Sequence, residues 1–106
     1  MPSGSTDTGL DQAIRLGVRE KRLVEFRLHG LQRIGEPHVY GVHKGVPQLL
    51  IYQVGGESQS GSLPDWRRAN LPEITAFHLL DQTFSASRSI PTGRHGGWDE
   101  IFVTVS

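Results

Sequence analysis

Residues 38–56, HVYGVHKGVPQLLIYQVGG, predict a β-hairpin. Apolar and β-branched residues dominate both halves, and Lys44-Gly45 supplies a turn between them, because glycine adopts a positive φ without strain. The second half, from Val46 to Val54, is predicted as one strand. The first half extends upstream into a strand from about Leu31 to Val42. Since proline cannot donate to a sheet ladder, Pro37 predicts a bulge or an edge position in that strand.

Strand patterns continue on both sides of the hairpin. Upstream, Val24, Phe26 and Leu28 alternate with polar residues, and this period of two predicts a half-buried strand from Leu23. Downstream, two runs are dense in β-branched and aromatic residues, and two segments between the apolar runs have turn composition. The predicted strands are 74–81 and 100–105, and the predicted exposed loops are 55–66 and 85–97.

A short amphipathic helix is predicted before the strands. Thr8 and Asp11 have the spacing of a capping box, which predicts a helix start at Thr8 and leaves residues 1–7 as a disordered arm. The helix is expected to end near Glu20, and Gly17 is expected to weaken it. Apolar residues recur at helical spacing and predict one buried stripe. They are Leu10, Ala13, Ile14 and Val18.

The order of these elements predicts a mainly β fold. One helix followed by five or six short strands, with no helix long enough to cross over, argues against a doubly wound α/β fold. We expect a small SH3-like or Sm-like antiparallel β-barrel with a packed N-terminal helix. The chain has 106 residues, and we find no repeat, so residues 8–106 are predicted to form a single domain.

Composition narrows the class of protein. The absence of cysteine excludes disulfides, thiolate zinc sites and thiol catalysis, and it suits a reducing compartment. The N-terminus lacks the basic start and apolar run of a signal peptide, and no window approaches the ~20 apolar residues of a membrane span. We therefore expect a cytoplasmic protein without a membrane partner. Net charge is zero, although residues 15–44 carry seven Lys or Arg against three Glu.

Catalytic and metal signatures are weak. His38 and His43 are the closest histidines, but an odd separation on a strand sends them to opposite faces, so no metal site is predicted. The candidate nucleophilic serines lie in loop-rich stretches, without a GxSxG elbow or a partner base: Ser58, Ser60, Ser62, Ser85, Ser87 and Ser89. No phosphate-binding loop or dinucleotide fingerprint occurs. We predict no catalytic residue, no cofactor and no enzymatic activity.

The first candidate ligand residues lie on the hairpin. Tyr40 lies on its first strand, and Gln48 and Tyr52 share one face of the second, so two rings and an amide can lie together. Such an arrangement can bind a planar ligand. The alternative is that these side chains form the solvated face of an ordinary sheet.

The second group of candidates is Trp66, Arg67 and Arg68, which combine a stacking surface with guanidinium groups that pair with anions. Phosphates, carboxylates and stacked bases all suit this chemistry. The alternative is that Trp66 packs into the barrel and one arginine pairs with Glu57 or Asp65.

The order of motifs resembles that of the WYL domain family. Three segments, 13–30, 33–56 and 66–84, follow one another as their counterparts do in that family. Their sequences are AIRLGVREKRLVEFRLHG, RIGEPHVYGVHKGVPQLLIYQVGG and WRRANLPEITAFHLLDQTF. Two departures stand out. The Trp-Tyr-Leu triplet is replaced by Gln48-Leu49-Leu50, and the segment Asn70 to Ile74 lacks two arginines of the family pattern.

The resemblance implies an Sm-like, SH3-type barrel with a ligand-sensing role, as in bacterial transcription regulators that also carry a helix-turn-helix domain. We therefore expect a non-enzymatic regulatory domain that binds a nucleotide-like ligand or a short single-stranded nucleic acid. The alternative is a protein-interaction barrel without a small ligand, in which the strand 31–42 or the terminal strand pairs with a regulator or forms a homodimer. The expected ligand-binding residues are Tyr40, Gln48, Tyr52, Trp66, Arg67 and Arg68.

Overall fold

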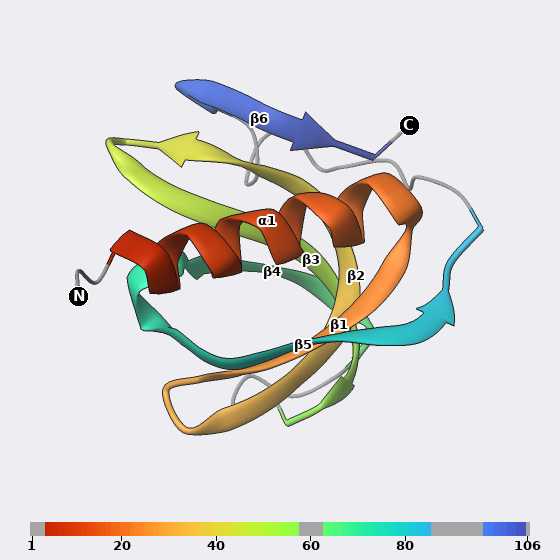
Figure 1. Cartoon of the computed structure of the whole chain (residues 1–106). Coiled ribbons are helices and arrows are strands. Elements are labelled where there is room, and N and C mark those ends of the chain that lie inside the picture. Colours follow the sequence, from red (N-terminus) through yellow and green to blue (C-terminus); the bar gives the residue numbers. More distant parts are fainter. Residues whose placement is uncertain (1–3, 58–62, 86–96, 106) are drawn as a thin grey trace.

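The structure is a computed structural model that describes residues 4–57, 63–85 and 97–105. Within these ranges the chain forms one α-helix, one short 3-10 helix and six strands (Figure 1). No helix in the described part is long and apolar enough to cross a membrane. The elements are α1 (Gly4–Glu20), β1 (Arg22–Leu28), β2 (Leu31–His43), β3 (Val46–Gly56), β4 (Asp65–Asn70), η1 (Leu71–Glu73), β5 (Ile74–Thr83) and β6 (Glu100–Thr104).

The six strands form one antiparallel sheet in the order β4-β3-β2-β1-β5, with β6 added beside β2. One edge of β2 pairs with β3, while its other edge pairs first with β1 and then with β6. This confirms a mainly β, antiparallel fold with one helix. The described parts of β4 and β5 are joined by η1 but do not pair with each other, so the sheet is not closed.

Pro37 lies where β2 changes partners. The pairing of β2 with β1 ends at Gly35, and the pairing of β2 with β6 begins at Val39. The register with β3 shifts between Pro37 and Val39, which confirms a bulge. Between these two partners one edge of β2 has no described neighbour at Pro37, so the proline leaves no ladder position unsatisfied there, although β2 as a whole lies inside the sheet.

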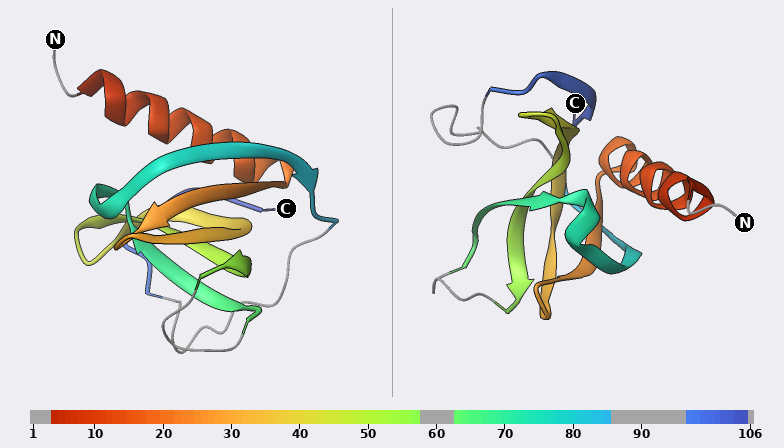
Figure 2. Two further views of the ribbon diagram at one scale, coloured as in Figure 1. Left: turned by 90° about the horizontal axis from the view of Figure 1, so that it is seen from below. Right: turned by 90° about the vertical axis from the view of Figure 1, so that its left-hand side faces the viewer.

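The helix α1 covers one face of the curved sheet (Figure 2). Ile14 and Phe26 are buried there, as the predicted apolar stripe and the alternation in β1 require. Gly17 is also part of this contact, because a Cβ at this position would lie 3.0 Å from Leu79 Cδ2 and 3.3 Å from Val24 Cγ1. Glycine therefore lets the helix lie close to the sheet, which offsets its low helix propensity.

The helix begins earlier than its capping pattern predicts. It starts at Gly4, so the predicted start at Thr8 was wrong, and residues 4–7 belong to the helix rather than to an arm. No proline interrupts this stretch, so helical hydrogen bonding can continue through a residue that would otherwise serve as a cap. The predicted end near Glu20 is confirmed, and Lys21 follows it with a φ of 52°.

The strand β4 was not predicted from the sequence, because most of the segment Asp65–Asn70 lacks the alternation of a half-buried strand. It pairs along its length with β3, from Gln48↔Asn70 to Gln53↔Asp65. The predicted loop 55–66 is therefore shorter, because β3 continues to Gly56 and β4 begins at Asp65. Most of the other predicted loop, residues 86–96, lies outside the described residues, as do residues 58–62.

Candidate functional site

The register of the hairpin separates Tyr40 from the other hairpin candidates. His43 pairs with Val46 across the turn, and this register places Tyr40 opposite Leu49. Tyr40 and Leu49 belong to the core under α1, whereas Tyr52 packs against a cluster on the reverse face of the sheet. The prediction that Tyr40 lies beside Gln48 and Tyr52 was therefore wrong. Successive residues of a strand point to opposite faces, and a two-residue turn pairs even-numbered with odd-numbered positions here.

Four of the six candidates lie together on the reverse face. The ring centroids of Tyr52 and Trp66 are 5.2 Å apart in an edge-to-face arrangement. Arg68 Nη1 donates to Gln48 Oε1 at 3.3 Å. Arg67, one residue away, points to the other side of the sheet, where it forms an ion pair with Asp65 at 2.8 Å. Adjacent arginines thus serve different faces of the molecule.

Trp66 is part of the packed interior of the reverse face. It is only 8% exposed, and its ring stands edge-on to the ring of His38, with centroids 5.0 Å apart. His38 is fully buried, and its Nε2 lies 3.1 Å from Glu36 Oε1. The alternative for this segment is therefore confirmed: Trp66 packs into the fold and one arginine pairs with Asp65.

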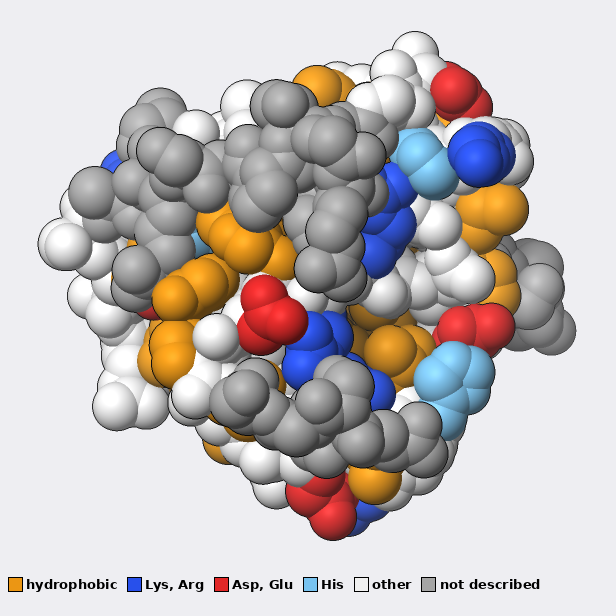
Figure 3. Space-filling model, turned by 180° about the vertical axis from the view of Figure 1, so that it is seen from behind, with side chains coloured by type: hydrophobic (Ala, Val, Ile, Leu, Met, Phe, Trp, Pro, Cys, Tyr) orange, Lys and Arg blue, Asp and Glu red, His pale blue; other side chains and the backbone are white. Residues whose placement is uncertain are grey.

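A group of side chains that we call the cationic–aromatic corner consists of His43, Lys44, Arg68 and Trp98. The guanidinium carbon of Arg68 lies 5.0 Å from the centroid of the Trp98 ring, and the His43 ring lies 6.1 Å from it. A cation over an indole face is attracted by the ring quadrupole. On the face opposite the helix, Lys and Arg side chains gather beside a histidine (Figure 3).

The electrostatics of the corner favour negative charge. Burial lowers the pKa of Arg68 from its usual value. The pKa of His43 is lowered first by burial and then by the charges of Arg68 and Lys44, while Asp99 opposes the shift. Two cationic side chains, Arg68 and Lys44, thus share this region with a neutral imidazole and one carboxylate, an arrangement that suits an anionic partner.

Arg33 and Arg67 form a second group of positively charged side chains. Arg33 is 8% exposed, and among the described residues its side chain makes one hydrogen bond, from Nη1 to Gln53 Oε1 at 3.2 Å, while its buried Nε has no partner. Burial and the charge of Arg67 lower the pKa of Arg33. Sequence reasoning missed Arg33, His43 and Trp98 as site residues. For Arg33 the sequence held one signal, which is an arginine at an inward-facing position of the strand β2.

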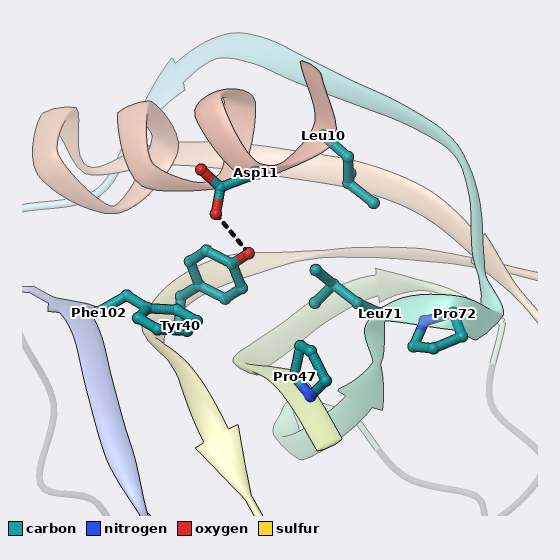
Figure 4. A pocket seen from close by; sticks show the side chains of 7 residues that line it. All are labelled: Leu10, Asp11, Tyr40, Pro47, Leu71, Pro72 and Phe102. Atoms are coloured by element: carbon teal, nitrogen blue, oxygen red, sulfur yellow. Dashed lines mark hydrogen bonds between the residues drawn. The ribbon is translucent and has the colours of Figure 1, made fainter. Parts of the chain in front are cut away.

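A cavity of about 480 Å³ lies between the N-terminal half of α1 and one end of the sheet (Figure 4). Tyr40 lines it, so this candidate residue faces the cavity and not the sheet face that carries Gln48 and Tyr52. The Tyr40 hydroxyl donates to Asp11 Oδ1 at 2.7 Å. The remaining lining residues are apolar: Leu10, Pro47, Leu71, Pro72 and Phe102.

The other histidines do not assemble into a site. His29 pairs with Glu73 at 3.1 Å on the surface, and His78 is exposed. Among the residues that the structure describes, no group of three or more His, Cys, Asp or Glu is arranged to hold a metal ion. His95 and most of the loop serines lie outside the described ranges.

Comparison with known proteins adds no assignment. No family model matches the chain, and neither a curated protein nor a solved structure is significantly similar to it. The role of each residue above therefore rests on its own geometry and chemistry.

Proposed function

We propose that this domain is a non-enzymatic sensor that binds a planar anionic ligand, a nucleotide or a short single strand of nucleic acid, at the cationic–aromatic corner. The observation that carries the proposal is the position of the Arg68 guanidinium over the Trp98 ring. An indole face and a guanidinium plane both stack on bases, and arginine also donates paired hydrogen bonds to phosphate.

Two further features support an anionic ligand at this place. Gln48 holds Arg68 through its Oε1, and its own Nε2 donates to Asn70 Oδ1 at 2.6 Å, so the guanidinium is oriented before a ligand arrives. Besides burial, the charges of Arg68 and Lys44 lower the pKa of His43, and a phosphate would compensate these charges. Preorganised and partly desolvated cations bind anions more strongly than flexible surface lysines do.

The finer architecture belongs to the same proposal. The curved sheet, with η1 between β4 and β5, is consistent with a small SH3-like or Sm-like barrel, in which β4 and β5 would be the two strands that approach each other. The resemblance of the motif order to the WYL domain supports a regulatory role, in which this chain senses a ligand beside a separate DNA-binding partner.

Fluorescence anisotropy with a labelled oligothymidylate and a labelled adenine nucleotide tests the proposal. Arg68→Ala should weaken binding by about tenfold or more, since it removes one stacking surface and one charge-assisted hydrogen bond. Arg19→Ala is the matched control, because Arg19 is an exposed arginine on α1 whose loss changes net charge equally.

The two variants separate a site from a general charge effect. Equal affinity of Arg68→Ala and the unchanged protein, at low salt and with the fold intact by circular dichroism, would refute the corner as the ligand site. Equal losses in Arg68→Ala and Arg19→Ala would mean that only net charge matters.

Self-association is a second candidate, favoured by one observation on β6. Ile101 is 51% exposed on this strand, and β6 pairs with β2 alone among the described strands. An edge strand with an exposed apolar side chain can pair with a second copy. The strand β2 cannot serve in this way, because both of its edges are occupied. A homodimer should therefore form through β6.

Light scattering at increasing protein concentration tests this second candidate. If β6 mediates a dimer, Ile101→Lys should shift the average mass toward that of a monomer. A monomeric protein at every concentration would contradict it.

A further inference from the structure

The cavity beneath α1 has the size and walls of a small-molecule site. Its volume of about 480 Å³ falls within the ~300–1,000 Å³ typical of ligand pockets. It lies on the helix-covered side of the sheet, away from the cationic–aromatic corner, and takes its walls from α1, β2, β3, η1 and β6. None of its lining residues contributes to the proposed nucleotide site, so it requires a separate explanation.

The apolar walls are rigid and suit a ring. Pro47 and Pro72 bound the cavity, and proline side chains have little conformational freedom to lose when a ligand binds. Phe102 forms part of the wall and meets the Tyr40 ring edge-to-face, with centroids 5.0 Å apart. Flat aromatic surfaces and fixed proline rings favour an aromatic occupant over a flexible chain.

Asp11 supplies the polar feature of the cavity. Its Oδ1 accepts from the Tyr40 hydroxyl at 2.7 Å, and its Oδ2 accepts from Arg15 Nε at 3.0 Å. An ionised carboxylate offers about four acceptor positions, so hydrogen-bonding capacity remains for a ligand donor. The Asp11 side chain is 33% exposed, which leaves it reachable at the cavity.

The charge of Asp11 is already balanced. Arg15 forms an ion pair with it, and the same guanidinium lies 4.9 Å from the Phe102 ring centroid and 5.6 Å from that of Tyr40. A cationic ligand would therefore face a compensated carboxylate and a nearby guanidinium, which would repel it. A neutral ligand meets no such penalty.

We propose that this cavity binds a small neutral aromatic molecule with one hydrogen-bond donor, of the phenol class. Its ring lies among Pro47, Leu71 and Phe102, and its hydroxyl donates to the Asp11 carboxylate beside the Tyr40 hydroxyl. This site is independent of the nucleotide site, and either can exist without the other.

A pair of probes that differ only in the donor tests the proposal: p-cresol and toluene, titrated into the full chain and followed by amide chemical shifts. Both should give saturable shifts at residues of the cavity, and p-cresol should bind about tenfold more tightly, as expected for one hydrogen bond to a charged acceptor. The absence of saturable shifts up to the solubility limit of both probes would overturn the site.

Three variants separate the parts of the proposal. Leu71→Trp fills the cavity and should abolish binding of both probes, with Leu10→Trp as the substitute if that variant does not fold. Leu80→Trp is the matched control, since Leu80 is a partly buried leucine outside the cavity lining, and it should bind both probes normally.

Asp11→Asn tests the donor. It keeps an oxygen for the Tyr40 hydroxyl but replaces the second acceptor with a donor, so the preference for p-cresol should disappear while toluene binding is retained. Equal affinities for the two probes in the unchanged protein would refute recognition by Asp11. Oligothymidylate binding should be unaffected in Asp11→Asn and Leu71→Trp, which distinguishes failure of this site from failure of the nucleotide site.

Discussion

Asp11 and Tyr40 form a hydrogen-bonded pair whose pKa values move in opposite directions. Burial favours the neutral form of Asp11, but hydrogen bonds from Tyr40 and Arg15 outweigh it and lower the pKa of Asp11 below 3.8. Burial and the bond to Asp11 raise the pKa of Tyr40 above 10.0. The stability from Asp11 is therefore present above pH ~4 and lost as pH falls through the lowered pKa. The stability from Tyr40 is present below pH ~10 and lost as pH rises further.

Tyr40→Phe tests this pair. Because the variant removes the hydrogen bond that favours the ionised carboxylate, the pKa of Asp11 should rise, as followed by carboxyl NMR shifts during an acid titration. The free energy of unfolding should fall by roughly 1 kcal/mol, the usual net value of one hydrogen bond. An unchanged pKa of Asp11 would show that the Tyr40 hydroxyl is not its partner in solution.

His43 reports on the charge of the cationic–aromatic corner. Since Arg68 contributes to lowering its pKa, Arg68→Gln should raise the pKa of His43 toward 6.5. In the unchanged protein, His43 binds a proton more readily in the unfolded state than in the folded state. The free energy of unfolding therefore decreases as pH falls from ~6.5 through the lowered pKa. Imidazole proton shifts measure the pKa directly, and Arg19→Gln should leave it unmoved.

At the scale of elements, the substitution of two glycines by alanine is expected to change the free energy of unfolding in opposite directions. Gly41 lies where β2 pairs with β6, and a Cβ there would overlap the carbonyl oxygen of Glu100. Gly9 lies in α1, and apart from the neighbouring backbone of the helix, a Cβ there would have no atom within 4 Å. The same substitution therefore strains one element contact and leaves the other undisturbed.

Gly41→Ala should lower the free energy of unfolding by roughly 1–3 kcal/mol, as overpacking does, and increase hydrogen exchange at the amides of β6. Gly9→Ala should raise it by roughly 0.5–1 kcal/mol through the loss of glycine entropy in a helix. Urea denaturation measures both. A neutral Gly41→Ala would mean that β6 does not pack against β2 at this register.

At the scale of the whole molecule, β6 completes two regions at once. It follows Trp98 of the cationic–aromatic corner, and it carries Phe102 in the wall of the cavity. It also pairs with the C-terminal half of β2, from Val39 to Val42. Its removal would expose a strand edge of β2 and open the apolar cavity, which are both features that promote aggregation.

Deletion of residues 97–106 should therefore lower the thermal midpoint and cause concentration-dependent light scattering. A synthetic peptide of the deleted sequence should restore both toward normal by pairing with the free edge of β2. The same peptide with Phe102→Ser serves as a control, since it keeps the backbone hydrogen bonds but lacks the ring that packs on Tyr40. Equal rescue by both peptides would contradict a packing role for Phe102.

The hairpin was largely predictable because turns and alternation are local signals. The pairing of His43 with Val46 follows from the two-residue turn, and it already implies that Tyr40 and Gln48 face opposite sides. The bulge at Pro37 likewise follows from the missing backbone donor. The early start of α1 was not predictable from the capping pattern, because the pattern marks where a helix can begin and not where the preceding residues cease to be helical.

By itself the sequence determined the mainly β class, the buried stripe of α1, the alternation of β1 and the hairpin, because each depends on the period of apolar residues or on turn chemistry within a short segment. Only the tertiary structure decided that residues 65–70 form a strand, that Arg68 meets Trp98, and that Asp11 meets Tyr40 at a cavity. These contacts join segments far apart in the chain, and they depend on which strand edges and helix faces the packed molecule brings together.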